Sequence, residues 1–263
     1  HAPLNAFTES VFDAQFDAVA ASGAREFLVT MWGDNGAECS TASVLPSLAY
    51  FAQMNFSQAD FADKFLKKTV GYSHAEMLAL DSPNEISSDS AAQVNPGKYL
   101  LYQDAFYGIE ELRTVPDFPE RYAARTKRLA ALSRRDSPYA YLFGTLAALC
   151  SFLELKSTLA ADNDAAYKNK DRAALAFLAG TRYPETIRRL KKFIAAFDKQ
   201  WKKENRPFGF EIHRFRLYGC LAQLDGKIVK IEELEEEKLC SVPDDAEVVL
   251  YNDFQSSASY NGF

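Results

Sequence analysis

From residue 57 onward, helix patterns follow one another and strand patterns almost vanish. Ser57-x-x-Asp60 and Ser73-x-x-Glu76 have the spacing of capping boxes, in which side chains bind the free backbone N–H groups at the start of a helix. Apolar residues then recur at helical spacing. The sequence predicts a long surface loop over 80–97 and helices over about 120–134, 139–159, 173–179, 184–204 and 211–239, the last interrupted by Gly219 and Gly226. Such a succession predicts an all-α bundle.

The first 56 residues differ, because a strand pattern stands between two helix patterns. A helix that starts at Thr8 and stops at Gly23 precedes a short buried strand over Arg25–Met31. A polar loop over 32–40 follows, and Pro46 lies in the first turn of another helix. Helix, strand, loop and helix in this order are typical of α/β proteins.

These patterns divide the chain into three parts. We expect an α/β segment over 1–56 and a helical domain over 57–240. The remaining residues, 241–263, predict an extended tail with one edge strand at Glu247–Tyr251, where β-branched residues gather.

The charge balance argues against a nucleic-acid partner. The chain of 263 residues has 30 Lys and Arg against 36 Asp and Glu, a formal net charge of −6. A surface that binds duplex phosphates needs a surplus of cations, and no basic run here is longer than a short pair on a helical pattern.

Neither a metal nor a cofactor is expected. The four cysteines lie far apart with no C-x-x-C pair, and the chain has three histidines, so zinc-ribbon and histidine-rich metal sites have no support. Free thiols are the better interpretation, and they favour a cytoplasmic location.

One uncharged segment, residues 137–153, invites a membrane interpretation. It falls short of the roughly 20 strongly apolar residues that a spanning helix needs. We therefore expect a buried core helix and no membrane partner.

The loop after the predicted strand offers the most specific chemistry. Trp32 has a flat apolar face that suits the C–H face of a sugar ring, and the carboxylate of Asp34 can accept hydrogen bonds from sugar hydroxyls. An aromatic platform beside a carboxylate at the end of a strand is typical of sugar sites in α/β barrels. Tryptophan is also a common core residue, and Asp-Asn-Gly is a common turn, so both ordinary interpretations remain open.

Four segments together resemble glycoside hydrolase family 20, most closely its bacterial exo-β-N-acetylhexosaminidase branch. The most specific is Trp-Gly-Asp-Asn-Gly-Ala-Glu at 32–38, and the others are 2–7, 98–104 and 206–211. The resemblance implies a mainly α chain, in which a C-terminal helical bundle domain follows the last helix-strand-helix units of a (β/α)8 barrel. Residues 1–56 would then be the C-terminal remnant of the catalytic barrel.

The resemblance also implies a reaction. The family removes terminal N-acetylglucosamine or N-acetylgalactosamine with retention of configuration, and the acetamide oxygen of the substrate acts as the nucleophile. An adjacent Asp-Glu pair after the fourth barrel strand orients the acetamide and acts as general acid/base. This chain contains no Asp-Glu dipeptide, so it would contain no catalytic residue, and we expect the pair upstream of His1 in the missing part of the barrel.

Two substrate-binding residues carry over by position. Trp32 resembles the wall of the −1 subsite, and Asp34 resembles the acidic residue that binds the 4- and 6-hydroxyls of the sugar. The partners implied are glycans that end in N-acetylhexosamine and the N-terminal part of the barrel.

Two hypotheses of function follow. In the first, the chain is the C-terminal part of a family 20 hexosaminidase, with a helical domain that either supports the barrel or forms a homodimer contact. In the second, it is a free-standing, non-catalytic helical interaction module in which Trp32 is a core residue.

Overall fold

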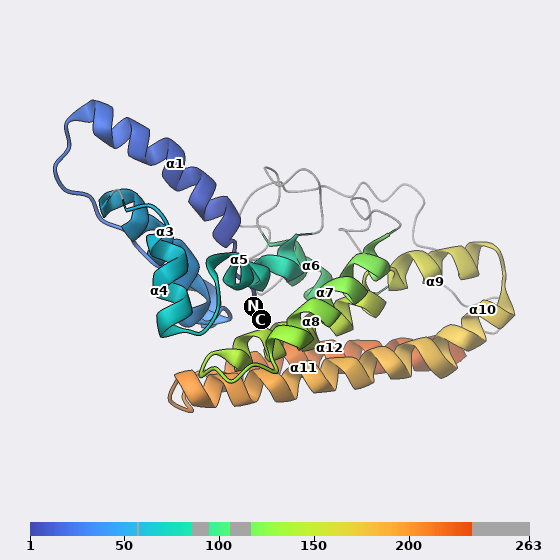
Figure 1. Ribbon diagram of the computed structural model, residues 1–263. Helices are drawn as coiled ribbons and strands as arrows, with labels where there is room; N and C mark the ends of the chain where they lie inside the picture. Colours follow the sequence, from blue (N-terminus) through green and yellow to red (C-terminus); the bar gives the residue numbers. More distant parts are fainter. Residues whose placement is uncertain (57, 86–94, 106–116, 233–263) are drawn as a thin grey trace.

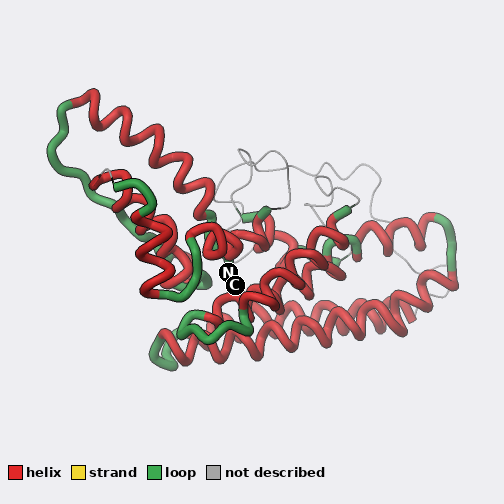
Figure 2. Tube along the Cα trace, viewed as in Figure 1, coloured by secondary structure: helices red, strands yellow, loops and turns green. Residues whose placement is uncertain are grey.

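A computed structural model describes residues 1–56, 58–85, 95–105 and 117–232. Within these ranges the chain is built from helices and connecting loops, with no strand (Figure 2). The mainly helical fold is therefore confirmed. The remnant of a barrel is not visible in this part of the chain.

Four long helices form the bundle that occupies the lower half of Figure 1. They are α7 (Phe118–Leu132), α8 (Ala140–Lys156), α11 (Tyr183–Glu204) and α12 (Phe210–Glu232). Helix α8 packs against both α7 and α11, and α11 packs in turn against α12. The central side chains, fully or almost fully buried, include Tyr122, Leu129, Phe143, Phe152, Leu190, Phe193, Phe197 and Leu217. Burial of such apolar side chains is the main stabilising contribution to a helical domain of this kind.

The uncharged segment predicted to be a core helix forms most of α8. The stretch Ala140–Lys168, which includes α8 and the following α9, is long and apolar enough to cross a membrane, and 72% of its most apolar window is buried inside the protein. Because α8 is surrounded by other helices, packing in a core explains its composition.

Shorter helices connect and extend the bundle. Before α7 come α4 (Phe61–Thr69), α5 (His74–Met77), the 3-10 helix η2 (Leu78–Asn84) and α6 (Pro96–Tyr102). Between α8 and α11 come α9 (Leu159–Lys168), α10 (Arg172–Phe177) and the π-helical turn η5 (Leu178–Arg182), on the right of Figure 1.

The capping box at Ser73 is confirmed, whereas the predicted surface loop over 80–97 is wrong in part. The Ser73 hydroxyl accepts from the Glu76 N–H at 3.1 Å, and the Glu76 carboxylate accepts from the Ser73 N–H at 2.8 Å. Residues 80–84 belong to the buried helix η2, and Pro96 lies in the first turn of α6. Residues 86–94 and Ser57 lie outside the described residues.

The first 56 residues form α1 (Asn5–Ser22), the short α2 (Asp34–Ala37), η1 (Thr41–Val44) and α3 (Leu45–Phe56). Helix α1 points away from the bundle at the upper left of Figure 1 and packs against α3. It starts at Asn5 rather than at Thr8, whose hydroxyl donates to the Leu4 carbonyl inside the helix, and it ends as predicted at Gly23, with φ +72°.

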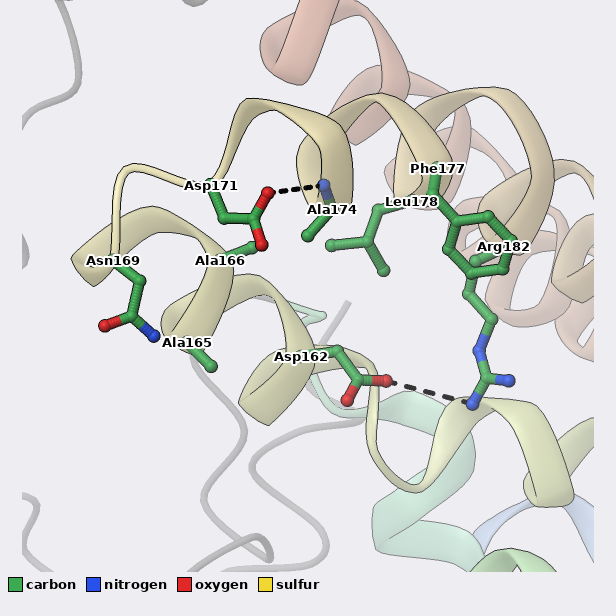
Figure 3. A pocket seen from close by; sticks show the side chains of 9 residues that line it. All are labelled: Asp162, Ala165, Ala166, Asn169, Asp171, Ala174, Phe177, Leu178 and Arg182. Atoms are coloured by element: carbon green, nitrogen blue, oxygen red, sulfur yellow. Dashed lines mark hydrogen bonds and ion pairs between the residues drawn. The ribbon is translucent and has the colours of Figure 1, made fainter.

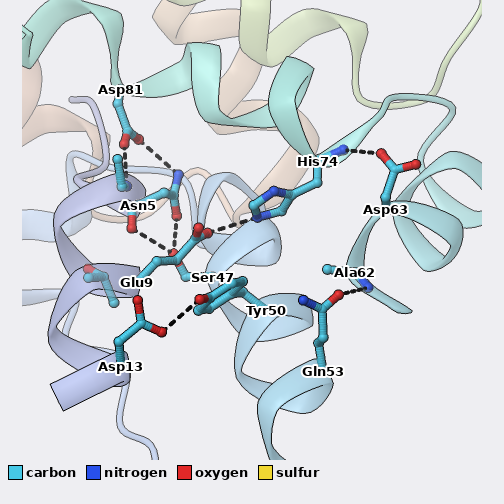
Figure 4. Close-up of polar contacts among 12 residues, drawn as sticks. Asn5, Glu9, Asp13, Ser47, Tyr50, Gln53, Ala62, Asp63, His74 and Asp81 are labelled. Atoms are coloured by element: carbon cyan, nitrogen blue, oxygen red, sulfur yellow. Dashed lines mark hydrogen bonds and ion pairs between the residues drawn. The ribbon is translucent and has the colours of Figure 1, made fainter. Parts of the chain in front are cut away.

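A buried polar network joins the start of α1 to η2 and α3 (Figure 4). The Asn5 side-chain amide donates to the Asp81 carboxylate at 2.9 Å, and the Ala6 N–H donates to the other Asp81 oxygen at 2.8 Å. The Ser47 hydroxyl donates to the Asn5 side-chain oxygen at 2.8 Å. Burial raises the pKa of Asp81 to about 6, although these hydrogen bonds lower it.

The predicted strand over Arg25–Met31 is wrong for this structure. Residues 24–33 are neither helix nor strand, and the side chain of Leu28 is 86% exposed. A strand needs a neighbour to receive its backbone hydrogen bonds, and the described chain offers none. The predicted edge strand at Glu247–Tyr251 lies outside the described residues.

Candidate functional site

The two predicted sugar contacts lie where an extended segment turns into α2. Trp32 is 80% exposed, and its indole N–H donates to the Thr30 hydroxyl at 2.8 Å. Asp34 is the first residue of α2, two positions further along the chain. The aromatic face of Trp32 is therefore available to a ligand, and the interpretation of Trp32 as a core residue is wrong.

The last residue of the same motif, Glu38, is bound by two cations from the helical domain. Only 5% of Glu38 is exposed. Its Oε2 lies 2.9 Å from Nζ of Lys98 on α6, and its Oε1 lies 3.0 Å from Nη1 of Arg216 on α12. The Tyr102 hydroxyl donates to Oε1 at 3.1 Å, and His1 Nε2 lies 3.9 Å from Oε2. The carboxylate therefore has polar partners on both oxygens.

The charges explain why this buried carboxylate stays ionised. Burial raises the pKa of Glu38, whereas nearby positive charges, Lys98 and Arg216 among them, lower it, and the net result is a pKa below its ordinary value. Burial and the nearby Glu38 raise the pKa of Tyr102 well above its usual range, so its hydroxyl remains a donor. An ionised acceptor among cationic and neutral donors forms strong, charge-assisted hydrogen bonds.

Gly36 lies against α12 in a backbone conformation that favours glycine. Its φ is +87°, and a side chain here would place Cβ 3.3 Å from Cε1 of the fully buried His213. Burial lowers the pKa of His213, so the imidazole is neutral at pH 7. The loop between Trp32 and Glu38 thus touches α12 at Gly36 and is bound to it at Glu38.

Three charged residues near the start of α12 have partners within the protein. Arg216 pairs with Glu38, and Arg214 lies 3.7 Å from Asp198 on α11. The Glu211 carboxylate instead accepts from the Gly209 N–H at 3.0 Å. The pairing of Arg216 with the sugar-contact motif could not be seen from sequence, because 178 positions separate the two residues.

A separate pocket of about 340 Å³ lies between α9, α10 and η5 (Figure 3). Its two acidic side chains have local partners: the Asp171 carboxylate caps α10 by accepting from the Ala174 N–H at 2.9 Å, and Asp162 lies 3.9 Å from Arg182. It lies at the end of the bundle away from α3 and α4 (Figure 1). We assign no chemistry to this pocket.

The described residues contain no cluster of three or more histidine, cysteine or acidic side chains that could hold a metal ion. Cys150 and Cys220 are free and buried, and Cys39 is free and partly buried. Burial raises the pKa of the Cys220 thiol to about 12, so it is not a reactive thiolate at neutral pH.

The fold defines a helical domain that binds the loop at 32–38 through Glu38. Comparison with protein families identifies the domain: the model of the Glycoside Hydrolase 20C C-terminal domain matches residues 74–257, more than two thirds of the chain. The chain therefore belongs to glycoside hydrolase family 20 and represents a C-terminal portion of it. A search of curated proteins found no match.

Proposed function

We propose that this chain is the C-terminal part of a retaining β-N-acetylhexosaminidase, which releases terminal N-acetylglucosamine or N-acetylgalactosamine by substrate-assisted hydrolysis. The match to the family's C-terminal domain over residues 74–257 carries this proposal. The exposed Trp32 and the adjoining Asp34 support it, because they are the two residues that resemble the sugar contacts of the family.

The roles follow from the chemistry of each group. Trp32 stacks on the C–H face of the sugar in the −1 subsite, and Asp34 accepts hydrogen bonds from the 4- and 6-hydroxyls. The acetamide of the substrate attacks the anomeric carbon, while an Asp-Glu pair outside this chain orients the acetamide and protonates the leaving oxygen.

The exposed segment before Trp32 fits this proposal. Residues 25–31 have the composition of a buried strand, yet Leu28 is 86% exposed and Phe27 and Met31 are also exposed. Pairing with a neighbouring barrel strand would cover these side chains and satisfy their backbone groups. We propose the same origin for residues 1–56 as a whole: the last part of a (β/α)8 barrel.

An assay of two proteins tests the proposal. We expect the complete natural protein that contains this chain to cleave aryl N-acetyl-β-hexosaminides, and the coding sequence upstream of His1 to encode strand-helix repeats with an Asp-Glu pair after a strand. We expect the purified 263-residue chain to release no aryl group, because it has no Asp-Glu pair. Specific turnover by the chain alone, or an inactive complete protein, would refute the proposal.

The remaining properties are part of the same proposal. We expect a cytoplasmic enzyme whose partners are glycans ending in N-acetylhexosamine, with no nucleic acid or membrane as a ligand. We expect the helical domain to support the barrel or to form a homodimer contact. Localisation of the tagged complete protein and its mass in solution test these points.

One observation favours a second function, a protein-interaction module. Ile212, Phe215 and Tyr218 lie at helical spacing near the start of α12, Phe208 lies in the turn before it, and all four are exposed. An apolar stripe of this kind is typical of a surface that a partner covers. Activity of the complete protein that depends on Trp32 but not on Phe215 favours the hydrolase over this alternative.

A further inference from the structure

The motif at 32–38 combines two opposite environments within seven residues. Trp32 at its start is 80% exposed, whereas Glu38 at its end is 5% exposed. Trp32 is one of the proposed sugar contacts, whereas Glu38 is enclosed by other side chains of the protein. Glu38 therefore has a task other than contact with the sugar.

Three side chains from the helical domain hold the Glu38 carboxylate. Lys98 and Tyr102 lie on α6, and Arg216 lies on α12, at distances of 2.9, 3.1 and 3.0 Å from its oxygens. Both helices lie far along the chain from the loop, so these contacts join parts of the protein that the backbone does not connect directly. Removal of one partner from such a buried group leaves charges without compensation, which costs more than the loss of a surface ion pair.

The loop has little regular structure of its own. Helix α2 has four residues, no side chain caps its start, and the Ala37 N–H donates to the Gly33 carbonyl at 3.1 Å. So short a helix is not stable alone. Gly36 can approach His213 of α12 closely because it has no side chain, and this contact adds to the one that Glu38 makes with the same helix.

We propose that Glu38 is a positioning residue of the sugar site: by binding Lys98, Tyr102 and Arg216, it fixes the loop that carries Trp32 and Asp34 to helices α6 and α12. This rests on the proposed function for its consequence, and it assigns the helical domain a direct part in sugar binding. The loop is then ordered before the sugar binds, so the entropic cost of ordering it does not reduce the binding affinity.

Hydrogen exchange on the 263-residue chain tests the anchor without any assay of activity. We expect Glu38→Gln to keep the fold and to accelerate exchange of the Ala37 amide several-fold, with no change at the amides of α8. Glu185→Gln is the matched control, because it removes a paired carboxylate from the surface of α11, where Glu185 binds Arg188 and Arg189. Equal loop exchange in Glu38→Gln, Glu185→Gln and the wild type would overturn the proposal.

Lys98→Met gives a second, milder variant in case Glu38→Gln does not fold. It removes one cation from α6 and leaves the loop sequence and Arg216 intact. We expect the same local acceleration at Ala37, and an unchanged rate there would overturn the proposed role of α6.

Kinetics on the complete natural protein separate positioning from folding. Displacement of binding groups by about 1 Å lowers kcat/KM by about 10- to 100-fold, and for Glu38→Gln we expect most of this as a rise in KM. A purely structural role would lower kcat in proportion to the loss of folded enzyme and leave KM unchanged, which would overturn the proposal. A wild-type enzyme that cleaves no aryl N-acetylhexosaminide would overturn the proposed function instead, while faster loop exchange in Glu38→Gln would still support the anchor.

Discussion

Replacement of Trp32 by alanine tests the conclusion that its indole is exposed and contributes little to the stability of the core. With 80% of the residue exposed, folding buries about a fifth of a side chain that can bury roughly 250 Å². At about 25 cal/mol per Å², the loss in the free energy of unfolding is about 1.3 kcal/mol. The hydrogen bond to the Thr30 hydroxyl is exposed and adds little.

Trp201 is the matched control, because it is the other tryptophan of the chain. It is 7% exposed, its indole N–H donates to the Arg206 carbonyl at 2.9 Å, and its ring packs against Phe197, Phe210 and His213. Truncation of such a residue to alanine costs about 3–5 kcal/mol.

Urea unfolding of the 263-residue chain, followed by far-UV circular dichroism, gives both values. We expect Trp32→Ala to unfold at almost the wild-type urea concentration and Trp201→Ala at a much lower one. A loss of more than about 2 kcal/mol for Trp32→Ala would place its ring in a core and refute the reasoning. In the complete natural protein we expect Trp32→Ala to abolish most of the sugar affinity despite this small effect on stability.

Three further predictions concern stability. Burial raises the pKa of Asp81 to about 6 in the folded state, so the folded protein favours the protonated form and this group's contribution to the free energy of unfolding rises as the pH falls. When the pH falls from about 7 to 5, the free energy of unfolding of the wild type should rise by about 1 kcal/mol relative to that of Asp81→Asn. A fall in this difference, measured by urea unfolding, would contradict the raised pKa of Asp81. Gly97→Ala should lower the free energy of unfolding by about 1–3 kcal/mol, because Cβ would lie 2.7 Å from the Pro83 carbonyl oxygen. An unchanged melting temperature would show instead that the backbone shifts to make room for Cβ. Gly219→Ala should stabilise by about 0.5–1 kcal/mol, because the site in α12 is open and alanine favours helix, and a lower melting temperature would argue against an uninterrupted α12.

The sequence predicted the long helices well, because their signals are local. Pro184 lies in the first turn of α11, and the helix ends at Glu204 as predicted. The predicted breaks at Gly219 and Gly226 are wrong, since α12 continues through both. Leu217, Leu221 and Leu224 of α12 are buried in the bundle, and this packing outweighs the weak helix propensity of glycine.

Helix α9 and the segment before α2 show what local patterns miss. Helix α9 follows α8 after a turn at Ser157 and Thr158, which carries neither glycine nor proline, so no sequence signal marks the boundary. The strand pattern over 25–31 identifies residues suited to a sheet, but the presence of a partner strand is a property of the tertiary structure.

The candidate site also contains residues that the sequence predicts and one that it does not. Trp32 and Asp34 could be proposed from sequence because their chemistry is carried by the side chains themselves. The role of Glu38 could not, since it depends on Lys98 and Arg216, which lie 60 and 178 positions further along the chain. The sequence showed only that Glu38 is an acidic residue at the end of the most specific motif.

If the loop binds sugar as proposed, the arrangement gives a reason for the helical domain. A loop at the end of a barrel strand must leave its aromatic face open to the substrate, so it cannot be stabilised by burial of that face. It has to be held from behind, and in this chain the residue six positions after Trp32 supplies the connection. A carboxylate bound by cations of two separate helices suits this task, because it needs both helices in place and so makes the order of the loop depend on the folding of the whole domain. Loss of sugar affinity on mutation of α6 or α12, with the barrel untouched, is the behaviour that follows.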